Sequence, residues 1–159
     1  MIRKATIADI KPIHKLLLEY GNQGQLLSRP LSELYDHVRD FSVFIDKIDK
    51  EDQEEEMLAG CCALQFCWED LAEIRSLAVV SGFWKKKIGT TLVEEAISEA
   101  KAFDIRKLFT LTYQPDFFKQ FGFTLIDRSE LPLKIWKECI TCVKFPNCDE
   151  TAMIKTLTP

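Results

Sequence analysis

The sequence contains no apolar run long enough to span a membrane, and its first residues, MIRKATIADI, lack the long apolar core of a signal peptide. It also lacks a broad excess of basic charge. The formal net charge of −4 argues against a general nucleic-acid binder. No internal repeat or low-complexity segment stands out. We therefore expect a cytoplasmic globular protein, and 159 residues are enough for one domain with a sizeable core.

Two common binding sites are also missing or incomplete. The stretch GFWKKKIG at residues 82–89 is not a nucleotide P-loop, because no Gly-Lys-Ser/Thr follows at the required spacing. Cys139, Cys142 and Cys148 supply three thiols, but zinc normally takes four ligands and no histidine lies nearby. A fourth ligand would have to be Asp149 or a distant cysteine. We therefore favour no metal and six reduced thiols over a structural zinc site.

A strand, a basic loop and a helix follow one another from residue 71 onward. Residues 71–79 show the period-2 pattern of a strand, and from Ile88 the apolar residues fall on one stripe of a 3.6-residue helix. The loop at 83–87 carries three lysines and opens into the helix N-terminus, where unpaired backbone N–H groups attract anions. On these grounds alone, an ordinary crossover with a solvated basic loop is the simpler interpretation.

The rest of the chain alternates between the two periods, which indicates α/β architecture. Thr6 and Asp9 resemble a capping box at the start of the first helix. The acidic stretch KIDKEDQEEE at 47–56 predicts a solvated, mobile loop. The patterns predict strands at 2–5, 41–46, 57–68, 107–113, 124–127 and 150–156, and helices at 10–20, 31–38, 115–120 and 131–139.

The segment from residue 71 resembles the acetyl-CoA-binding core of the GCN5-related N-acetyltransferase (GNAT) family. That core has a strand glutamate, a Q/R-x-x-G-x-G/A loop and a helix. Aligned on Ile88 and Gly89, this chain has Trp84 at the Gln/Arg position and Lys87 at the middle glycine, so Gly89 alone keeps the signature. Four longer stretches resemble the short stand-alone bacterial N-acetylglutamate synthases: RPLSELYDHVRDFSVF, WEDLAEIRSLAV, LFTLTYQPDFFKQFGF and LPLKIWKECITCVKFPNCDETAMI.

This resemblance covers nearly the whole chain and implies a single GNAT domain over residues 1–159, with a mixed, mostly antiparallel central sheet flanked by helices. It implies transfer of acetyl from acetyl-CoA to the α-amine of L-glutamate, the first step of arginine biosynthesis. Acetyl-CoA and L-glutamate would be the partners, without nucleic acid or membrane, and a homodimer stays open. The alternatives are an acetyltransferase for another amine and a non-catalytic sensor of CoA or an amino acid.

The resemblance also implies roles for particular residues. Glu73 matches the strand glutamate and would deprotonate the amine, which cannot attack a thioester as an ammonium. Because glutamate carries two carboxylates, at least two cations should hold it, and each candidate could equally be a surface charge. Phe118 stands where many acetyltransferases have a tyrosine that protonates the leaving thiolate. The expected substrate-binding residues are Arg29, Arg75, Ser76, Lys134 and Lys144.

The cofactor is expected at the end of the strand and along the loop and helix start. A backbone N–H at the strand end would stabilise the oxyanion of the tetrahedral intermediate. The expected cofactor-binding residues are Leu77, Ala78, Val79, Lys85, Lys86, Lys87, Ile88, Gly89, Thr90, Thr91, Phe117 and Phe118.

Overall fold

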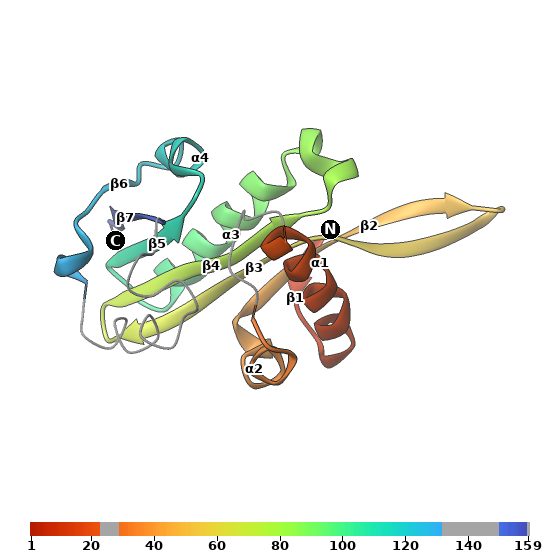
Figure 1. Ribbon diagram of the computed structural model, residues 1–159, viewed down its shortest axis with the longest axis horizontal. Coiled ribbons are helices and arrows are strands. Elements are labelled where there is room, and N and C mark those ends of the chain that lie inside the picture. The colour runs from red at the N-terminus through yellow and green to blue at the C-terminus, as the bar shows by residue number, and fades with distance from the viewer. Residues whose placement is uncertain (23–28, 132–149, 159) are drawn as a thin grey trace. The chain divides into compact units, whose positions relative to one another are not determined.

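The computed structural model describes residues 1–22, 29–131 and 150–158, with the backbone alone at residues 22 and 84–86 (Figure 1). Within these residues seven strands form one mixed, mostly antiparallel sheet in the order β1-β2-β3-β4-β5-β7-β6. The chain divides into two compact units: Met1–Leu64 with Ile74–Glu99, and Gln65–Glu73 with Ala100–Pro159. The strands are β1 (Ile2–Lys4), β2 (Phe41–Lys50), β3 (Gln53–Trp68), β4 (Leu71–Val79), β5 (Lys107–Thr112), β6 (Thr124–Leu125) and β7 (Thr151–Thr156).

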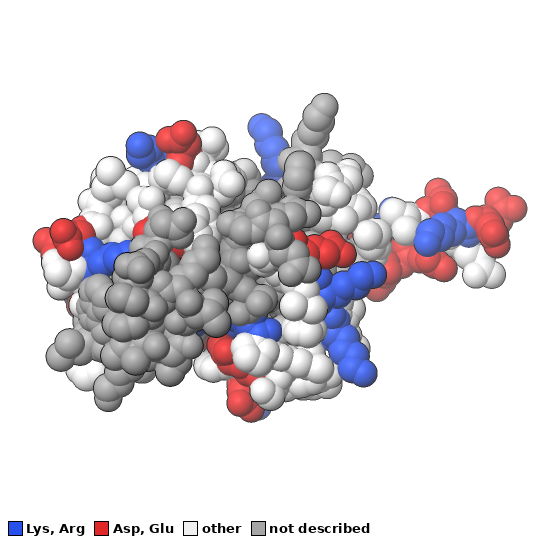
Figure 2. Space-filling model, viewed as in Figure 1, with Lys and Arg blue, Asp and Glu red and all other residues white. Residues whose placement is uncertain are grey.

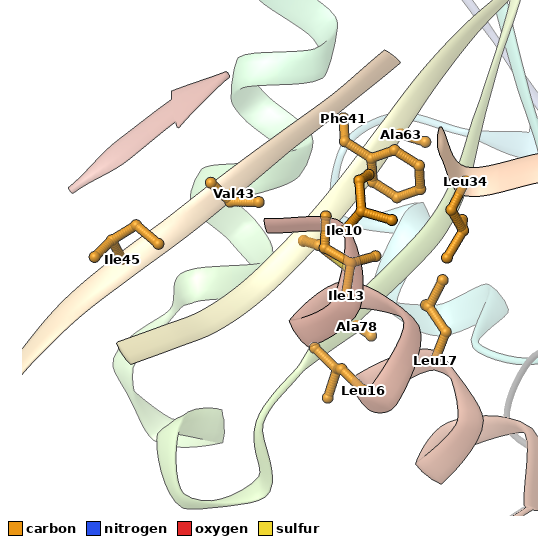
Figure 3. Packing of buried hydrophobic residues seen from close by; sticks show 11 residues of the cluster. Ile10, Ile13, Leu16, Leu17, Leu34, Phe41, Val43, Ile45, Ala63 and Ala78 are labelled. Atoms are coloured by element: carbon orange, nitrogen blue, oxygen red, sulfur yellow. The ribbon is translucent and has the colours of Figure 1, made fainter. Parts of the chain in front are cut away.

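The core of the first unit is built by helices packed on β2, β3 and β4. A 3-10 turn, η1 (Ile7–Asp9), leads into α1 (Ile10–Asn22), and α2 (Leu31–Asp36) is followed by the turn η2 (Val38–Asp40). Figure 3 shows how α1 and α2 point their apolar side chains at the strands. The buried cluster comprises Ile10, Ile13, Leu16, Leu17, Leu34, Phe41, Val43, Ile45, Cys61, Ala63 and Ala78.

The predicted capping box is confirmed at the start of this helical segment. The Asp9 carboxylate accepts hydrogen bonds from the backbone N–H of Thr6 at 2.7 Å and from Arg3 Nη1 at 2.7 Å. Burial alone would raise the pKa of Asp9, but the hydrogen bonds from Arg3 and Thr6 outweigh it and hold that pKa below its usual value. The carboxylate thus ties β1 to the first helical turn.

The stretch 47–56 is not a mobile loop, so that prediction is wrong. β2 and β3 pair without a break from Ile45↔Leu58 to Lys50↔Gln53, and Glu51 and Asp52 turn the chain with φ of 49° and 63°. Two successive left-handed residues match the twist of a hairpin. Lys47 pairs with Glu54 at 3.5 Å across the strands. Figure 1 shows this hairpin running beyond α1 and β1, and Figure 2 shows the charged side chains that cover its end.

The hairpin was missed because its side chains do not alternate between apolar and polar. Asp49 even lies opposite Glu54, a like-charge pair that disfavours the pairing. The ladder that begins in the apolar half of β2 and β3 continues outward through residues that carry no strand signal of their own.

Gly60 on β3 allows helix α3 (Ile88–Ala102) to lie close to the sheet. A methyl group at this position would be 3.0 Å from Leu92 Cδ1, 3.1 Å from Ile88 Cγ2 and 3.1 Å from the Ala78 carbonyl oxygen. Such contacts are tighter than ordinary van der Waals packing. A glycine is therefore needed where the first turns of α3 cross β3.

The second unit contains β5, β6, β7 and the short helix α4 (Pro115–Lys119), which begins at proline as predicted. β7 pairs antiparallel with both β5 and β6. The predicted strand at 124–127 is shortened to β6 and is followed by a 3-10 turn, η4 (Arg128–Glu130). The helix predicted at 131–139 lies outside the described residues after residue 131. In the described part of the chain, no helix combines the length and apolar character needed to cross a membrane.

Candidate active site

Strand β4 carries several of the expected site residues, and its regular geometry is interrupted at Ser76. The φ angle of Ser76 is 56°, in the left-handed region that residues other than glycine rarely adopt. Within a strand, such a residue is typical of a bulge, which redirects the side chains around it. The simple alternation predicted for residues 71–79 therefore does not run through Ser76.

Arg29 lies against this irregular part of β4. Its side chain is almost completely buried, with the residue 4% exposed. Nε donates to Glu33 Oε1 at 2.8 Å, Nη1 donates to Ser76 Oγ at 3.4 Å, and Cζ lies 5.6 Å from the centre of the Phe41 ring. Nη2 is buried and has no hydrogen-bond partner among the residues that the structure describes. Among the described residues, the two N–H donors of Nη2 are thus left for oxygens of a ligand.

Arg75 contributes a second positive charge to the same place. Burial lowers the pKa of Arg29, and the charge of Arg75 lowers it further, against the partial compensation that Glu33 provides. A guanidinium remains protonated in spite of such a shift, so two cations repel each other here. A bound anion would relieve both the repulsion and the unsatisfied donor.

Glu73 is the buried carboxylate of β4 and belongs to the second unit, at 6% exposure. A carboxylate is found at such burial only when polar or charged groups compensate for the lost water, and Glu73 does make interactions of this kind. It satisfies the first requirement of the sequence prediction, a carboxylate placed on the central strand.

Tyr20, to which the sequence analysis gave no role, fixes the end of β4. Its hydroxyl donates to the Val79 carbonyl oxygen and accepts from the Val79 N–H at 3.2 Å. The N–H of Val79, at the strand end where an oxyanion donor is expected, is therefore already hydrogen bonded. Only the apolar spacing of α1 singled out Tyr20 in the sequence, and that spacing says nothing about its hydroxyl.

The expected phosphate-binding loop is a 3-10 turn, η3 (Ser81–Lys86), followed by α3. Lys87 joins them with φ of 55°, the left-handed conformation that glycine adopts without strain, and its carbonyl oxygen accepts from Thr91 N at 3.1 Å. The side chain of Lys87 is exposed. The backbone thus takes the course expected for a glycine at this position, with the first N–H groups of α3 free of intrahelical acceptors.

The other expected residues fall into two groups. Phe118 is buried and packs edge-to-face against Phe117 and Phe123, with ring centres 5.3 and 5.4 Å apart. Lys134 and Lys144 lie outside the described residues, as do the cysteines of the incomplete zinc pattern at 139–148. Residues 1–22, 29–131 and 150–158 contain no group of three His, Cys, Asp or Glu side chains that could hold a metal ion.

Comparison with known proteins places this geometry in a family. The sequence model of the Acetyltransferase (GNAT) family matches residues 11–123. A protein of Chlorobaculum tepidum, named an uncharacterised N-acetyltransferase, is 39% identical over 98% of this chain and 96% of its own length. An amino-acid acetyltransferase of Mycobacterium tuberculosis is 30% identical over 87% of this chain and 76% of its own length. A Salmonella typhi amino-acid acetyltransferase is 32% identical over 82% of this chain, which spans only 28% of that protein.

Solved structures show the same similarity. A Mycobacterium tuberculosis protein in complex with CoA and NLQ has a TM-score of 0.81 and 26% identity over 99% of both chains. N-acetylglutamate synthase of Neisseria gonorrhoeae, complexed with coenzyme A and N-acetyl-glutamate, has a TM-score of 0.83 and 27% identity over 100% of this chain and 35% of that one. The family uses acetyl-CoA as its co-substrate. The protein therefore belongs to the GNAT family and is an acetyltransferase with the mixed-sheet fold of that family.

Proposed function

We propose that this protein transfers the acetyl group of acetyl-CoA to the α-amine of L-glutamate. The observation that carries the proposal is the buried Arg29, whose Nη2 has no hydrogen-bond partner among the described residues, next to the charge of Arg75. Two cations at one place suit an acceptor that carries carboxylates. The names of the relatives support the same class of acceptor, an amino acid.

Arg29 would bind one substrate carboxylate through Nη2, completing a guanidinium whose other nitrogens already face Glu33 and Ser76. Charge-assisted hydrogen bonds of this kind are about twice as strong as neutral ones. Arg75 would balance the second carboxylate, with Lys134 and Lys144 as further candidates. A neutral side chain offers Arg75 no second carboxylate, so we expect glutamine and neutral amino acids to be poorer acceptors than glutamate.

The chemistry requires the ammonium to lose a proton, and we assign this step to Glu73. The free amine nitrogen then attacks the thioester carbon, and the carbonyl oxygen becomes an oxyanion that one backbone N–H near the end of β4 would stabilise. The N–H of Val79 already donates to Tyr20. When the intermediate collapses, the carbon–sulfur bond breaks and coenzyme A leaves as a thiolate. The nitrogen, cationic after the attack, releases its second proton to solvent and becomes the neutral amide. Because Phe118 offers no phenol, the thiolate would leave without a proton from that position, which its low basicity permits.

Acetyl-CoA would be held by the loop and helix start at residues 85–91. Its pyrophosphate would accept from the free N–H groups at the start of α3 and face the positive end of the helix dipole. Lys87 would add charge there without obstructing the backbone, since its side chain is exposed. We further propose that the protein works in the cytoplasm as the first enzyme of arginine biosynthesis, from a single domain over residues 1–159. Sedimentation analysis would decide whether the protein is a homodimer.

The test is a steady-state assay of thiol release from acetyl-CoA with a panel of amino acids and amines as acceptors. We expect L-glutamate to give the highest kcat/KM, and Glu73→Gln to lower kcat at least about 100-fold because the base is lost. A different acceptor at the top of the panel would redirect the assignment to another amine. Full activity in Glu73→Gln would show that another group takes the proton.

A further inference from the structure

A buried cysteine on β3 lies directly behind the irregular part of β4. Cys61 has no exposed surface, and its Sγ donates to the Ser76 carbonyl oxygen at 3.4 Å. This contact reaches the residue that has the left-handed φ of 56°. The proposed mechanism makes no use of this thiol.

The same sulfur faces two more groups of the candidate site. Burial raises the pKa of Cys61 to about 12, while the backbone N–H of Ala78 and the charge of Arg29 act in the opposite direction. The group is therefore a neutral thiol that can donate to Ser76 while it faces the N–H of Ala78. One side chain thus contacts the backbone on both sides of Leu77.

The conformation of Ser76 matters because its Oγ accepts from Arg29 Nη1 at 3.4 Å. A change of Ser76 from left-handed to extended backbone would turn this hydroxyl away from the guanidinium, and Arg29 would lose one of the two hydrogen bonds that orient it. We propose that Cys61 is a positioning residue for the amino-acid substrate: its thiol holds Ser76 in the conformation from which Ser76 orients Arg29. The inference rests on the proposed function, in which Arg29 binds a substrate carboxylate.

The next residue provides a matched control. Cys62 is also buried, at 2% exposure, and its thiol lies 3.9 Å from the carbonyl oxygen of its own neighbour Ala63. Apart from Cys61 itself, the groups whose charges act on Cys62 are Glu99 and Lys4, which form an ion pair at 3.1 Å. Because neighbouring strand residues face opposite sides of a sheet, Cys62 tests the loss of a buried thiol without touching Ser76.

The experiment compares Cys61→Ala, Cys61→Ser and Cys62→Ala in the thiol-release assay and in urea unfolding. Both alanine variants should lose similar stability, since each removes one buried sulfur. Cys61→Ala should raise the KM for L-glutamate about fivefold, which is the effect expected when Arg29 loses its hydrogen bond to Ser76. The KM for acetyl-CoA should change less than about twofold. Cys61→Ser keeps a donor and should restore part of the KM, whereas Cys62→Ala should leave it unchanged.

Equal effects of Cys61→Ala and Cys62→Ala on the glutamate KM would overturn the proposal, as would a parallel rise in the KM for acetyl-CoA. If the unsubstituted protein acetylates no amino acid of the panel, the proposed function fails, and the inference is decided by crystal structures of the two alanine variants. A left-handed Ser76 in Cys62→Ala with an extended Ser76 in Cys61→Ala would support it. A left-handed Ser76 in both would refute it.

Discussion

Replacing Arg29 by methionine should remove substrate binding at little cost in stability. A buried polar group without a hydrogen-bond partner costs about 1–3 kcal/mol, and Nη2 of Arg29 is such a group among the described residues. Loss of the ion pair with Glu33 lowers the stability by at most about 1 kcal/mol, because the Glu33 side chain is 37% exposed and can be hydrated after the change. Methionine keeps the contact of a flexible apolar stem with Phe41. The hydrogen bond from Arg29 to Ser76 is also lost and contributes about 0.5–1.5 kcal/mol. The two losses and the gain then nearly cancel, so we expect the free energy of unfolding to change by less than about 1 kcal/mol.

Binding should respond very differently. Loss of one partner of a buried, hydrogen-bonded charge pair costs about 2–4 kcal/mol, which corresponds to a roughly 30- to 1000-fold rise in the KM for L-glutamate. The KM for acetyl-CoA should stay within about twofold, since the expected cofactor loop lies elsewhere in the chain. Urea unfolding at pH 7 and steady-state kinetics with each substrate varied in turn measure the two effects.

Arg39→Met is the control, because Arg39 is exposed on η2 and should change neither quantity. Our interpretation of Arg29 would be refuted by the reverse pattern, in which Arg29→Met loses more than about 3 kcal/mol of stability while the glutamate KM is unchanged. Arg29 would then be a structural residue, and a different cation would have to bind the substrate.

Three further substitutions test the surroundings of the site, each by urea unfolding. Gly60→Ala should lower the free energy of unfolding by about 1–3 kcal/mol and raise the KM for acetyl-CoA, because α3 must move. Gly82→Ala adds a methyl group with nothing within 4 Å of it, so it should be neutral or stabilising. Equal effects of the two substitutions would contradict the tight packing at Gly60. Tyr20→Phe should lower the free energy of unfolding by about 1–3 kcal/mol, because the N–H and carbonyl groups of Val79 lose their partner. Tyr35→Phe should lower it less. An equal loss in both variants would count against the contact between Tyr20 and Val79. Asp9→Asn should lower the free energy of unfolding by about 1–2 kcal/mol at pH 7. Because the pKa of Asp9 is lowered in the folded state, this contribution is present above about pH 4 and disappears as pH falls through the folded-state pKa. A stability difference between the two proteins that persists in strong acid would contradict the pairing with Arg3.

Much of the fold could be predicted from periodicity. The helix beginning at Ile88, the strand ending at Val79 and the helix beginning at Pro115 have the predicted positions, because their apolar residues follow one period and proline marks a helix start. The outer hairpin could not be predicted in this way. Its strands are held by backbone pairing that continues from the apolar half, and a rule based on side chains sees only charge between residues 47 and 56.

The candidate site was predictable in its residue types but not in its geometry. The family resemblance implied Arg29 and Arg75 as cations for a dicarboxylate. Nothing in the sequence shows that Arg29 is buried, with one nitrogen that has no hydrogen-bond partner among the described residues. The left-handed backbone of Ser76 was equally invisible, since serine has no special preference for it. Cys61 was predicted only as one of six reduced thiols, and its contact with Ser76 depends on the register of two strands.

A competition assay tests most simply whether L-glutamate is the preferred acceptor. Limiting acetyl-CoA is supplied with an equimolar mixture of L-glutamate, L-glutamine, L-aspartate and neutral amino acids, and the acetylated products are quantified by mass spectrometry. Because the product ratio equals the ratio of kcat/KM values, one measurement ranks the acceptors. We expect N-acetylglutamate to exceed N-acetylglutamine at least about 100-fold, the effect of one unpaired buried charge. An excess of any product with a neutral side chain would contradict the assignment of Arg29 and Arg75 to the two substrate carboxylates.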